Sequence, residues 1–211
     1  MKRITRTAIA FGLGAAALAF TAAMGPQDTA AKAKIGEAAP AWKLTDIKGK
    51  EHELKDFAGK TVVLEWTNPG CPYIVGVYDK GVVSETVKAM KEMGKDYVYI
   101  AVNSTGNKAK DAVIKENTDF LAKHKMDIPV VIDHDGTVGK TYGAKTTPHM
   151  YVIDTKGVLR YHGAFTDDPG SRKSPEHVNY VVQSLKQLAA GETVTPDHTK
   201  QWGCSVKYVA K

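Results

Sequence analysis

Residues 61–73, TVVLEWTNPGCPY, decide the fold of this chain. Residues 61–66 are a β-rich run typical of a buried strand, and Asn68-Pro69-Gly70 breaks that run. Pro72 is favourable as the first residue of a helix, which would make Cys71 the residue that caps it. A strand therefore ends and a helix begins within a few residues, with a cysteine at the junction.

The position of Cys71 predicts a reactive thiol. A side chain at a helix start points at unpaired backbone N–H groups and at the positive end of the helix dipole. Both stabilise a thiolate, and the thiolate is the nucleophilic form of cysteine. The alternative is an inert buried cysteine, which is common for a free thiol. The turn residues around Cys71 favour the reactive interpretation.

Strands and helices alternate on both sides of this junction. Strands are predicted over 97–102, 128–133, 149–154 and 158–161, and helices over 72–94, 109–123 and 176–190. Gly76 and Gly81 weaken the first half of the first helix. In the last helix, Val178, Val181, Val182, Leu185 and Leu188 are placed on one apolar face. The alternation predicts an α/β fold with a central mixed β-sheet flanked by helices.

The N-terminus has the pattern of a secretory signal peptide. Lys2, Arg3 and Arg6 precede an uncharged, mostly apolar run from Ala8 to Ala23. The alternative is an uncleaved membrane anchor, but sixteen residues fall short of the roughly 20 that span a bilayer, which favours the signal peptide. After its cleavage no stable membrane insertion is expected. Loss of residues 1–23 removes three of the 29 basic residues and lowers the formal net charge from +6 to +3.

The corrected charge bears on partners and location. No basic stripe interleaved with aromatic residues is present, so nucleic acid is not an expected partner. An exported protein is periplasmic or secreted, where disulfides form and persist. The domain division predicted for the chain is a signal peptide over 1–23, a flexible leader over 24–35, a folded domain over 36–190 and a tail over 191–211 without periodicity.

The cysteine and histidine content limits the chemistry. Cys71 and Cys204 are the only cysteines, which allows one disulfide and is too few for a four-thiolate zinc site or an iron–sulfur cluster. The seven histidines lack helical i, i+4 spacing and have no Cys-x-x-Cys beside them. Neither a metal nor another cofactor is therefore expected.

A second motif, Thr146-Thr147-Pro148-His149, precedes a strand, and an X-Pro bond at a strand start can be cis. On its own this motif is weak, but together with the Cys71-Pro72 helix start it points to a known fold family. Together the two resemble the thioredoxin superfamily, and more closely its redoxin branch, of the peroxiredoxin-like alkyl hydroperoxide reductase/thiol-specific antioxidant type. The segments that carry the resemblance are IGEAAP (35–40), EWTNPGCPY (65–73), YGAKTTPHMYVID (142–154), TKGVLRYHG (155–163) and WGCSVKY (202–208). The last is similar to the tail of a bacterial subgroup with a Gly-Cys-Ser-x-Lys signature.

The resemblance implies a thioredoxin-like fold with an N-terminal β-hairpin extension and a C-terminal tail. Cys71 would be the reactive thiol, and Cys204 would resolve its oxidised form. Thr147 and Pro148 would flank Cys71, where the backbone before the cis-proline pairs with an extended peptide. The remaining candidate substrate-binding residues are Trp66, Thr67 and Asn68. The implied partners are a peroxide or disulfide substrate and an external thiol reductant protein, in an antioxidant or redox-homeostasis role.

The chain also departs from its relatives. Thioredoxins proper carry Cys-x-x-Cys, but Asn68 lies three residues before Cys71. Peroxiredoxins proper carry Thr or Ser there and Pro seven before the cysteine, where this chain has Asn68 and Leu64. Their active-site arginine has no counterpart, since Gly136 occupies the comparable place, and Thr67 is one residue from the expected hydroxyl. A peroxide would be poorly oriented without these groups, whereas thiol exchange does not need them.

Two functions stay open at this point. The first is an exported thiol oxidoreductase that uses Cys71 and Cys204 as a redox pair. The second is a non-catalytic binding module with a structural Cys71–Cys204 disulfide, which would stabilise the fold by up to ~4–5 kcal/mol. Unpaired cysteines are a third possibility. His149 is equally open, either as a neighbour that raises thiolate content or shuttles a proton, or as a strand residue pointing away.

Overall fold

The computed structural model describes residues 32–170, 173 and 176–209. The predicted signal peptide and most of the predicted leader lie outside the described residues. The strands are β1 (Lys43–Asp46), β2 (Glu51–Glu53), β3 (Thr61–Trp66), β4 (Tyr97–Asn103), β5 (Val130–Ile132), β6 (Thr146–Thr147), β7 (His149–Ile153), β8 (Leu159–Gly163) and β9 (Cys204–Ser205). The helices are α1 (Pro72–Asp79), α2 (Val82–Met93), α3 (Lys110–Lys123), α4 (Thr137–Tyr142) and α5 (Tyr180–Ala189), with a 3₁₀ turn η1 (Leu54–Phe57).

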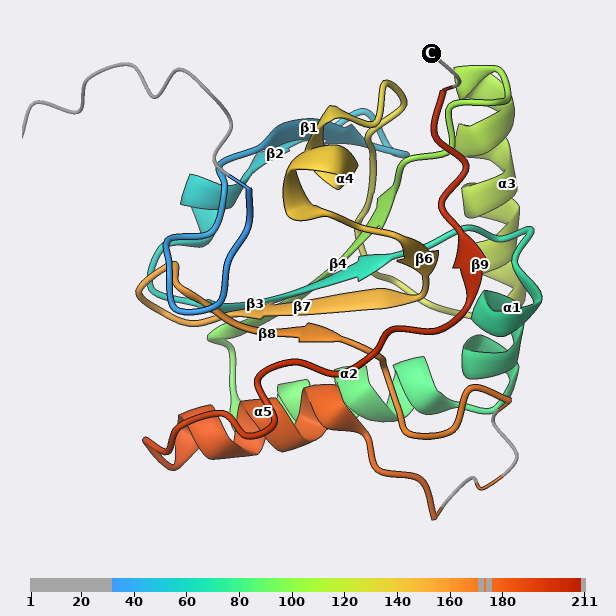
Figure 1. Ribbon diagram of the computed structural model, residues 1–211. Helices are drawn as coiled ribbons and strands as arrows, with labels where there is room; N and C mark the ends of the chain where they lie inside the picture. Colours follow the sequence, from blue (N-terminus) through green and yellow to red (C-terminus); the bar gives the residue numbers. More distant parts are fainter. Residues whose placement is uncertain (1–31, 171–172, 174–175, 210–211) are drawn as a thin grey trace, which may run out of the picture.

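The core of the fold is a seven-stranded sheet in the order β2-β1-β5-β4-β3-β7-β8 (Figure 1). β3 pairs parallel with β4 and antiparallel with β7, so the sheet is mixed, as predicted. All six residues of β3 are buried, which explains their almost continuous apolar sequence. β1 and β2 form an antiparallel hairpin at one edge, the predicted N-terminal extension.

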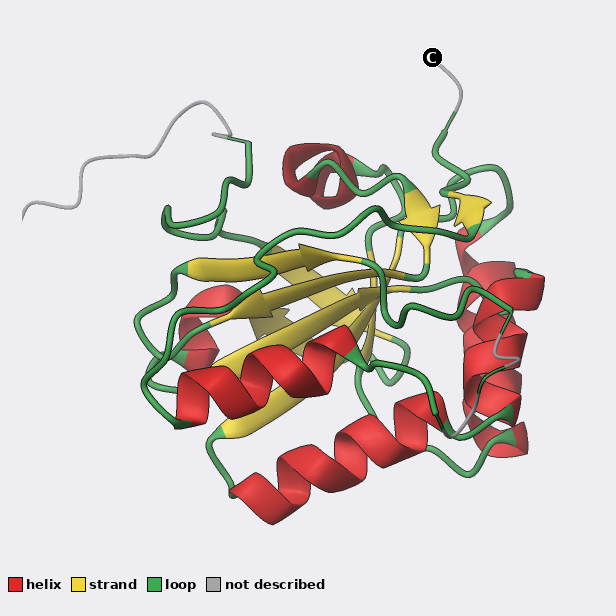
Figure 2. Cartoon of the chain, turned by 60° about the horizontal axis from the view of Figure 1, so that its bottom comes forward, coloured by secondary structure: helices red, strands yellow, loops and turns green. Residues whose placement is uncertain are grey.

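Helices cover both faces of this sheet. On one face α1, α2, α3 and α5 contribute apolar side chains to a large core cluster that also contains Cys71. Figures 1 and 2 show α2 and α5 lying side by side across this face. The other face carries a second cluster around Trp42, Trp66, Tyr142 and Tyr151, covered by α4, η1 and the N-terminal segment. The predicted α/β fold, a central mixed β-sheet flanked by helices, is confirmed.

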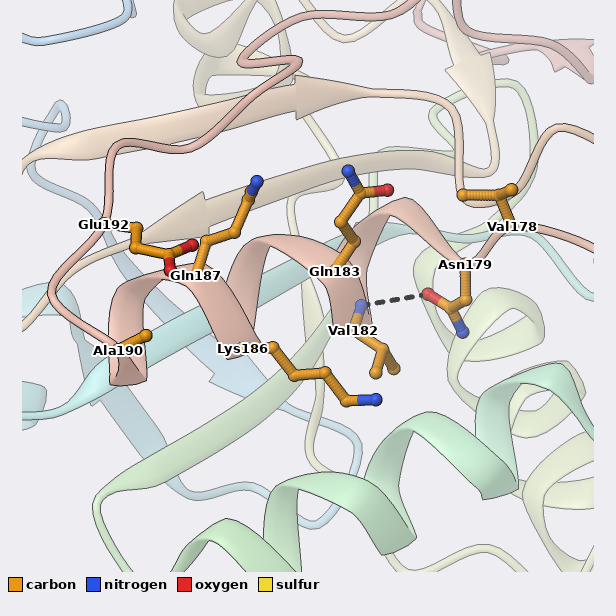
Figure 3. Close-up of a pocket in the computed structure, with 8 residues that line it drawn as sticks. All are labelled: Val178, Asn179, Val182, Gln183, Lys186, Gln187, Ala190 and Glu192. Atoms are coloured by element: carbon orange, nitrogen blue, oxygen red, sulfur yellow. Dashed lines mark hydrogen bonds between the residues drawn. The ribbon is translucent and has the colours of Figure 1, made fainter.

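Two predicted helices differ from the observed ones. The helix predicted over 72–94 is two helices, because Gly81 adopts a left-handed conformation (φ 79°) and caps α2. The helix predicted over 176–190 begins only at Tyr180. The Asn179 side chain caps it by accepting a hydrogen bond from the backbone N–H of Val182 at 3.1 Å (Figure 3). Val178, predicted to lie on the apolar face, precedes this cap and is 43% exposed.

The segment after α5 is more ordered than its lack of periodicity predicts. It runs back over the domain and adds strand β9, which pairs antiparallel with β6 in a separate two-stranded sheet (Figure 1). Beyond β9, the hydroxyl of Tyr208 donates a hydrogen bond to the carbonyl of Ala144 at 2.7 Å. The tail therefore returns Cys204 to the edge of the domain where β6 lies.

Candidate active site

Cys71 lies at the junction of β3 and α1, as the sequence predicts. It is the residue before the first helical turn, with extended backbone (φ −91°, ψ 121°) and Pro72 at the helix start. Asn68 stabilises the turn that leads to Cys71. Its side-chain oxygen accepts a hydrogen bond from the Gly70 N–H at 2.7 Å, and its backbone carbonyl accepts one from the Cys71 N–H at 2.9 Å. The Asn68 amide also donates to Thr105 at 3.1 Å, which ties this turn to the loop after β4.

The cis-proline loop faces Cys71 directly. The Thr147–Pro148 peptide bond is cis, in agreement with the motif in the sequence. The Cys71 thiol donates a hydrogen bond to the carbonyl of Thr147 at 3.0 Å. Cys71 is 2% exposed, so this contact takes place in a largely dry environment.

Cys204 completes the group. In the β6–β9 pair it lies opposite Thr147, the same residue whose carbonyl accepts from Cys71. Cys204 is half-buried and packs against the core cluster that contains Cys71, and both cysteines are free thiols. The fold thus brings together two thiols that lie at opposite ends of the domain sequence.

The electrostatics of the two thiols are unequal. Burial raises the pKa of Cys71, but interactions with the Cys204 and Thr147 side chains and with the backbone N–H of Ile74 outweigh it, so this pKa is lowered from its usual 9.0. Burial and the neighbouring Cys71 raise the pKa of Cys204 to about 11. Cys71 therefore ionises first, and Cys204 keeps its proton and stabilises the Cys71 thiolate.

Two of the predicted substrate-binding residues point into the core. Trp66 is fully buried on the opposite face from Cys71, and its indole N–H donates to Ser104 at 3.0 Å. Thr67 is buried with its side chain beside the carboxyl of Glu65. The structure brings Cys71, Cys204, Thr147 and Pro148 together, with Asn68 shaping the adjoining turn. Trp66 lies on the other face of the sheet from this group, and the Thr67 side chain interacts with Glu65.

His149 points away from Cys71. It is the β7 partner of Trp66 and shares the Trp66 face of the sheet, where its ring contacts Tyr151 (centroids 4.6 Å apart) and His162 (5.8 Å). Burial, followed by the nearby histidines and Lys145, lowers the pKa of His149 to about 3. His149 is therefore neutral, and of the two interpretations left open by the sequence, a strand residue that points away from Cys71 is the one that fits.

Glu65 is a feature that the sequence interpretation missed. Its carboxyl is completely buried in β3 and accepts hydrogen bonds from the hydroxyls of Tyr99 at 2.7 Å and Tyr78 at 3.1 Å. Burial raises the pKa of Glu65 to about 7. A single acid within an otherwise apolar strand was the signal available in the sequence.

Other sites in the described residues offer no competing chemistry. Groups of three or more possible metal ligands are absent from the part of the chain that the structure describes. Arg160, the only arginine described, forms an ion pair with Asp154 at 2.6 Å. A groove of about 600 Å³ follows α5 between Val178 and Glu192 (Figure 3). Its lining contains neither cysteine, and the described helices include none long and apolar enough to cross a membrane.

A family model described as the AhpC/TSA family matches residues 35–162. The chain belongs to the AhpC/TSA family. The matched residues include Cys71 and the cis-proline loop and end before the tail that carries Cys204. The redoxin resemblance and the thioredoxin-like fold predicted from the sequence are confirmed, and the assignment to a tail subgroup stays a prediction.

Individual relatives agree with the family. The thiol-disulfide oxidoreductase ResA of Bacillus cereus is 32% identical over 148 residues, which cover 67% of this chain and 76% of ResA. The thioredoxin-like protein YneN of Bacillus subtilis is 25% identical over 129 residues, 59% of this chain and 68% of YneN. Together with the family, these relatives identify the chain as an oxidoreductase of the redoxin type.

Solved structures show the same fold. A hypothetical protein from Sinorhizobium meliloti superposes with a TM-score of 0.74 at 20% identity, covering 84% of this chain and 96% of that one. An uncharacterized conserved protein from Geobacillus kaustophilus also superposes with a TM-score of 0.74, at 22% identity, covering 84% of this chain and 94% of that one.

Proposed function

We propose that this chain is an exported thiol-disulfide oxidoreductase in which Cys71 is the nucleophile and Cys204 the resolving cysteine. The observation that carries the proposal is the pair itself, a thiol of lowered pKa at a helix start beside a second thiol of raised pKa. Export is supported by the signal-peptide pattern of residues 1–23 and fits a protein that cycles through a disulfide.

The first step is attack by the Cys71 thiolate on a sulfur of the substrate disulfide. The substrate S–S bond breaks, one substrate half leaves as a thiolate and takes up a proton, and the other half stays bonded to Cys71. The backbone N–H of Ile74 and the dipole of α1 stabilise the thiolate before attack.

The second step is attack by Cys204 on the Cys71 sulfur. The bond between Cys71 and the substrate breaks, the second substrate thiolate leaves, and a Cys71–Cys204 disulfide forms. The pKa of Cys204 is raised partly by the Cys71 side chain, and that cause weakens once the Cys71 thiolate has been consumed. Cys204 is thereby held protonated until the first step is complete. An external dithiol then reduces the disulfide and supplies the two electrons.

We place hydroperoxide reduction second among the reactions of this site. The same thiolate can displace the leaving oxygen of a peroxide, and Cys204 can condense with the resulting sulfenic acid to release water. The described residues, however, place no guanidinium beside Cys71 to stabilise that leaving oxygen, since Arg160 is paired with Asp154.

Turnover of the purified chain with a disulfide and with hydrogen peroxide tests the proposal. With dithiol present, wild type is expected to reduce the disulfide repeatedly and Cys71→Ser to be inactive. In a single turnover without dithiol, Cys204→Ser should release one substrate thiol and stop as a mixed disulfide, whereas wild type should release both substrate thiols. Equal activity of Cys71→Ser and wild type would end the catalytic interpretation and leave the structural-disulfide alternative.

A further inference from the structure

The edge of β6 is the part of the site that a peptide substrate would use. Strand addition supplies main-chain hydrogen bonds to an extended segment, and β6 lies directly before the cis-proline and beside Cys71. In this structure β9 already fills that edge. Thr147 pairs with Cys204 and Thr146 with Ser205, and the N–H of Val206 donates to the carbonyl of Lys145 at 3.1 Å.

The fit between the tail and this edge is close. Gly203 has φ +126°, and a Cβ there would collide with the carbonyl of Thr147. Only glycine allows the tail backbone to approach the cis-proline loop so closely.

Aromatic anchors hold the tail on both sides of Cys204. Before Cys204, the indole N–H of Trp202 donates a hydrogen bond to the carbonyl of Thr166 at 2.7 Å. The Trp202 ring also packs against the ring of Tyr73 in α1, with the two ring centroids 5.9 Å apart. After Cys204, Tyr208 packs on the bare backbones of Gly136 and Gly139, where any side chain would meet its ring or hydroxyl.

A further backbone bond continues this anchoring, since the N–H of Gly106 donates to the carbonyl of Lys207 at 2.8 Å. Gly136, which occupies the place of the active-site arginine of peroxiredoxins, thus provides the space into which the Tyr208 ring of the tail packs. These contacts hold residues 202–208, which include β9, against the domain.

We infer that residues 202–208 act as an internal occupant of the peptide-binding edge, so that the intact protein takes small disulfides in preference to disulfides within extended peptides. The inference rests on the proposed function and names the substrate class of that site. An extended peptide must first displace β9 and its anchors to pair with β6, whereas a small disulfide has no backbone that must pair with that edge. The apparent affinity for a peptide falls with the fraction of molecules in which the tail is displaced.

The test compares two disulfides that share a leaving group. One is bis(2-hydroxyethyl) disulfide, and the other is a short unstructured peptide whose central cysteine is linked to 2-mercaptoethanol. Single-turnover rates are measured for wild type, for Tyr208→Ala, for the matched control Tyr208→Phe and for a chain that ends at Ser205. The two tail variants keep Cys71 and Cys204. In the full-length proteins, hydrogen exchange of the Gly106 amide reports whether the tail is docked.

The expected result is a change in selectivity. Tyr208→Ala and the shortened chain should raise the ratio of the peptide rate to the small-disulfide rate about tenfold, because only the peptide competes with β9 and a change in the Cys71 thiolate affects both substrates alike. Tyr208→Phe, which keeps the ring on the glycines, should stay near wild type. Unchanged ratios in both tail variants, or equal rates of wild type with the two substrates, would overturn the inference. Activity that survives in Cys71→Ser would instead refute the proposed function.

Discussion

At Cys71, burial and hydrogen bonding act in opposite directions on one thiol. Desolvation favours the neutral form, whereas the Cys204 and Thr147 side chains and the backbone N–H of Ile74 favour the thiolate. The balance depends on Cys204, the largest of the contacts that lower the pKa. In the proposed cycle, Cys204 therefore has a role in the reduced state as well as in the disulfide.

Cys204→Ala should raise the pKa of Cys71 because it removes a hydrogen-bond donor next to the thiolate. Cys204→Ser keeps a donor at the same place and is the matched control, with a smaller rise expected. The thiolate absorbance near 240 nm, followed against pH with Cys71→Ser as blank, measures both. An alanine variant that titrates like wild type would show that Cys204 does not stabilise the thiolate.

Glu65 makes the stability of the protein depend on pH. Its pKa rises from 4.5 to about 7 on folding because the carboxyl is buried, so the folded state holds an extra proton between these values. The stabilisation is complete below pH 4.5 and is lost as the pH rises through 7. At pH 8.5 the ionised carboxyl costs about 3 kcal/mol relative to pH 4.

Glu65→Gln removes this dependence and keeps an oxygen for Tyr78 and Tyr99 to donate to. Relative to wild type, the variant should gain about 3 kcal/mol in free energy of unfolding between pH 4 and pH 8.5. Urea unfolding at the two pH values under reducing conditions measures the gain. A constant difference between the two proteins would mean that Glu65 does not titrate on folding.

Among the elements, strand β9 can approach the cis-proline loop closely because the residue before it, Gly203, has no side chain. Gly203→Ala introduces a Cβ against the Thr147 carbonyl at positive φ, a strain of about 1–3 kcal/mol. The docked fraction of the tail, and with it the rate of Cys71–Cys204 disulfide formation, should fall about tenfold or more. Alkylation quenching after addition of a small disulfide follows that rate.

Gly191→Ala is the control for this substitution. Gly191 also has positive φ, +73°, but nothing lies within 4 Å of a Cβ placed there. It therefore reproduces the backbone strain without the collision. Equal slowing in both variants would assign the effect to general destabilisation and not to β9.

The elements that sequence could predict are those with a period or a sharp boundary. The apolar run of β3, the Cys71-Pro72 junction and the Thr147-Pro148 motif are local, and the structure has each where it was expected. β9 has two residues, too few for a pattern, and it exists only because β6 is beside it. The inward positions of Trp66 and Thr67 likewise depend on which sheet face each residue takes.

For the whole molecule, a Cys71–Cys204 disulfide would join two residues that are adjacent in space and separated by most of the domain sequence. Closing a loop of over a hundred residues stabilises the folded oxidised form by up to about 4–5 kcal/mol on the chain-entropy model. By the thermodynamic cycle, the disulfide potential of the folded protein would then lie about 100 mV below that of the unfolded chain. The stabilised Cys71 thiolate acts against this, because it favours the reduced form.

The measured potential decides between a redox couple and a static staple. With the two effects opposed, we expect it within the range of catalytic dithiols, about −120 to −270 mV, as measured by equilibration with glutathione buffers. Cys204→Ser, which forms no intramolecular disulfide, gives the baseline. A potential well below about −300 mV would place the chain among proteins with a structural disulfide. In that case the tail would serve as a permanent clamp, and the unequal pKa values of Cys71 and Cys204 would have no part in turnover.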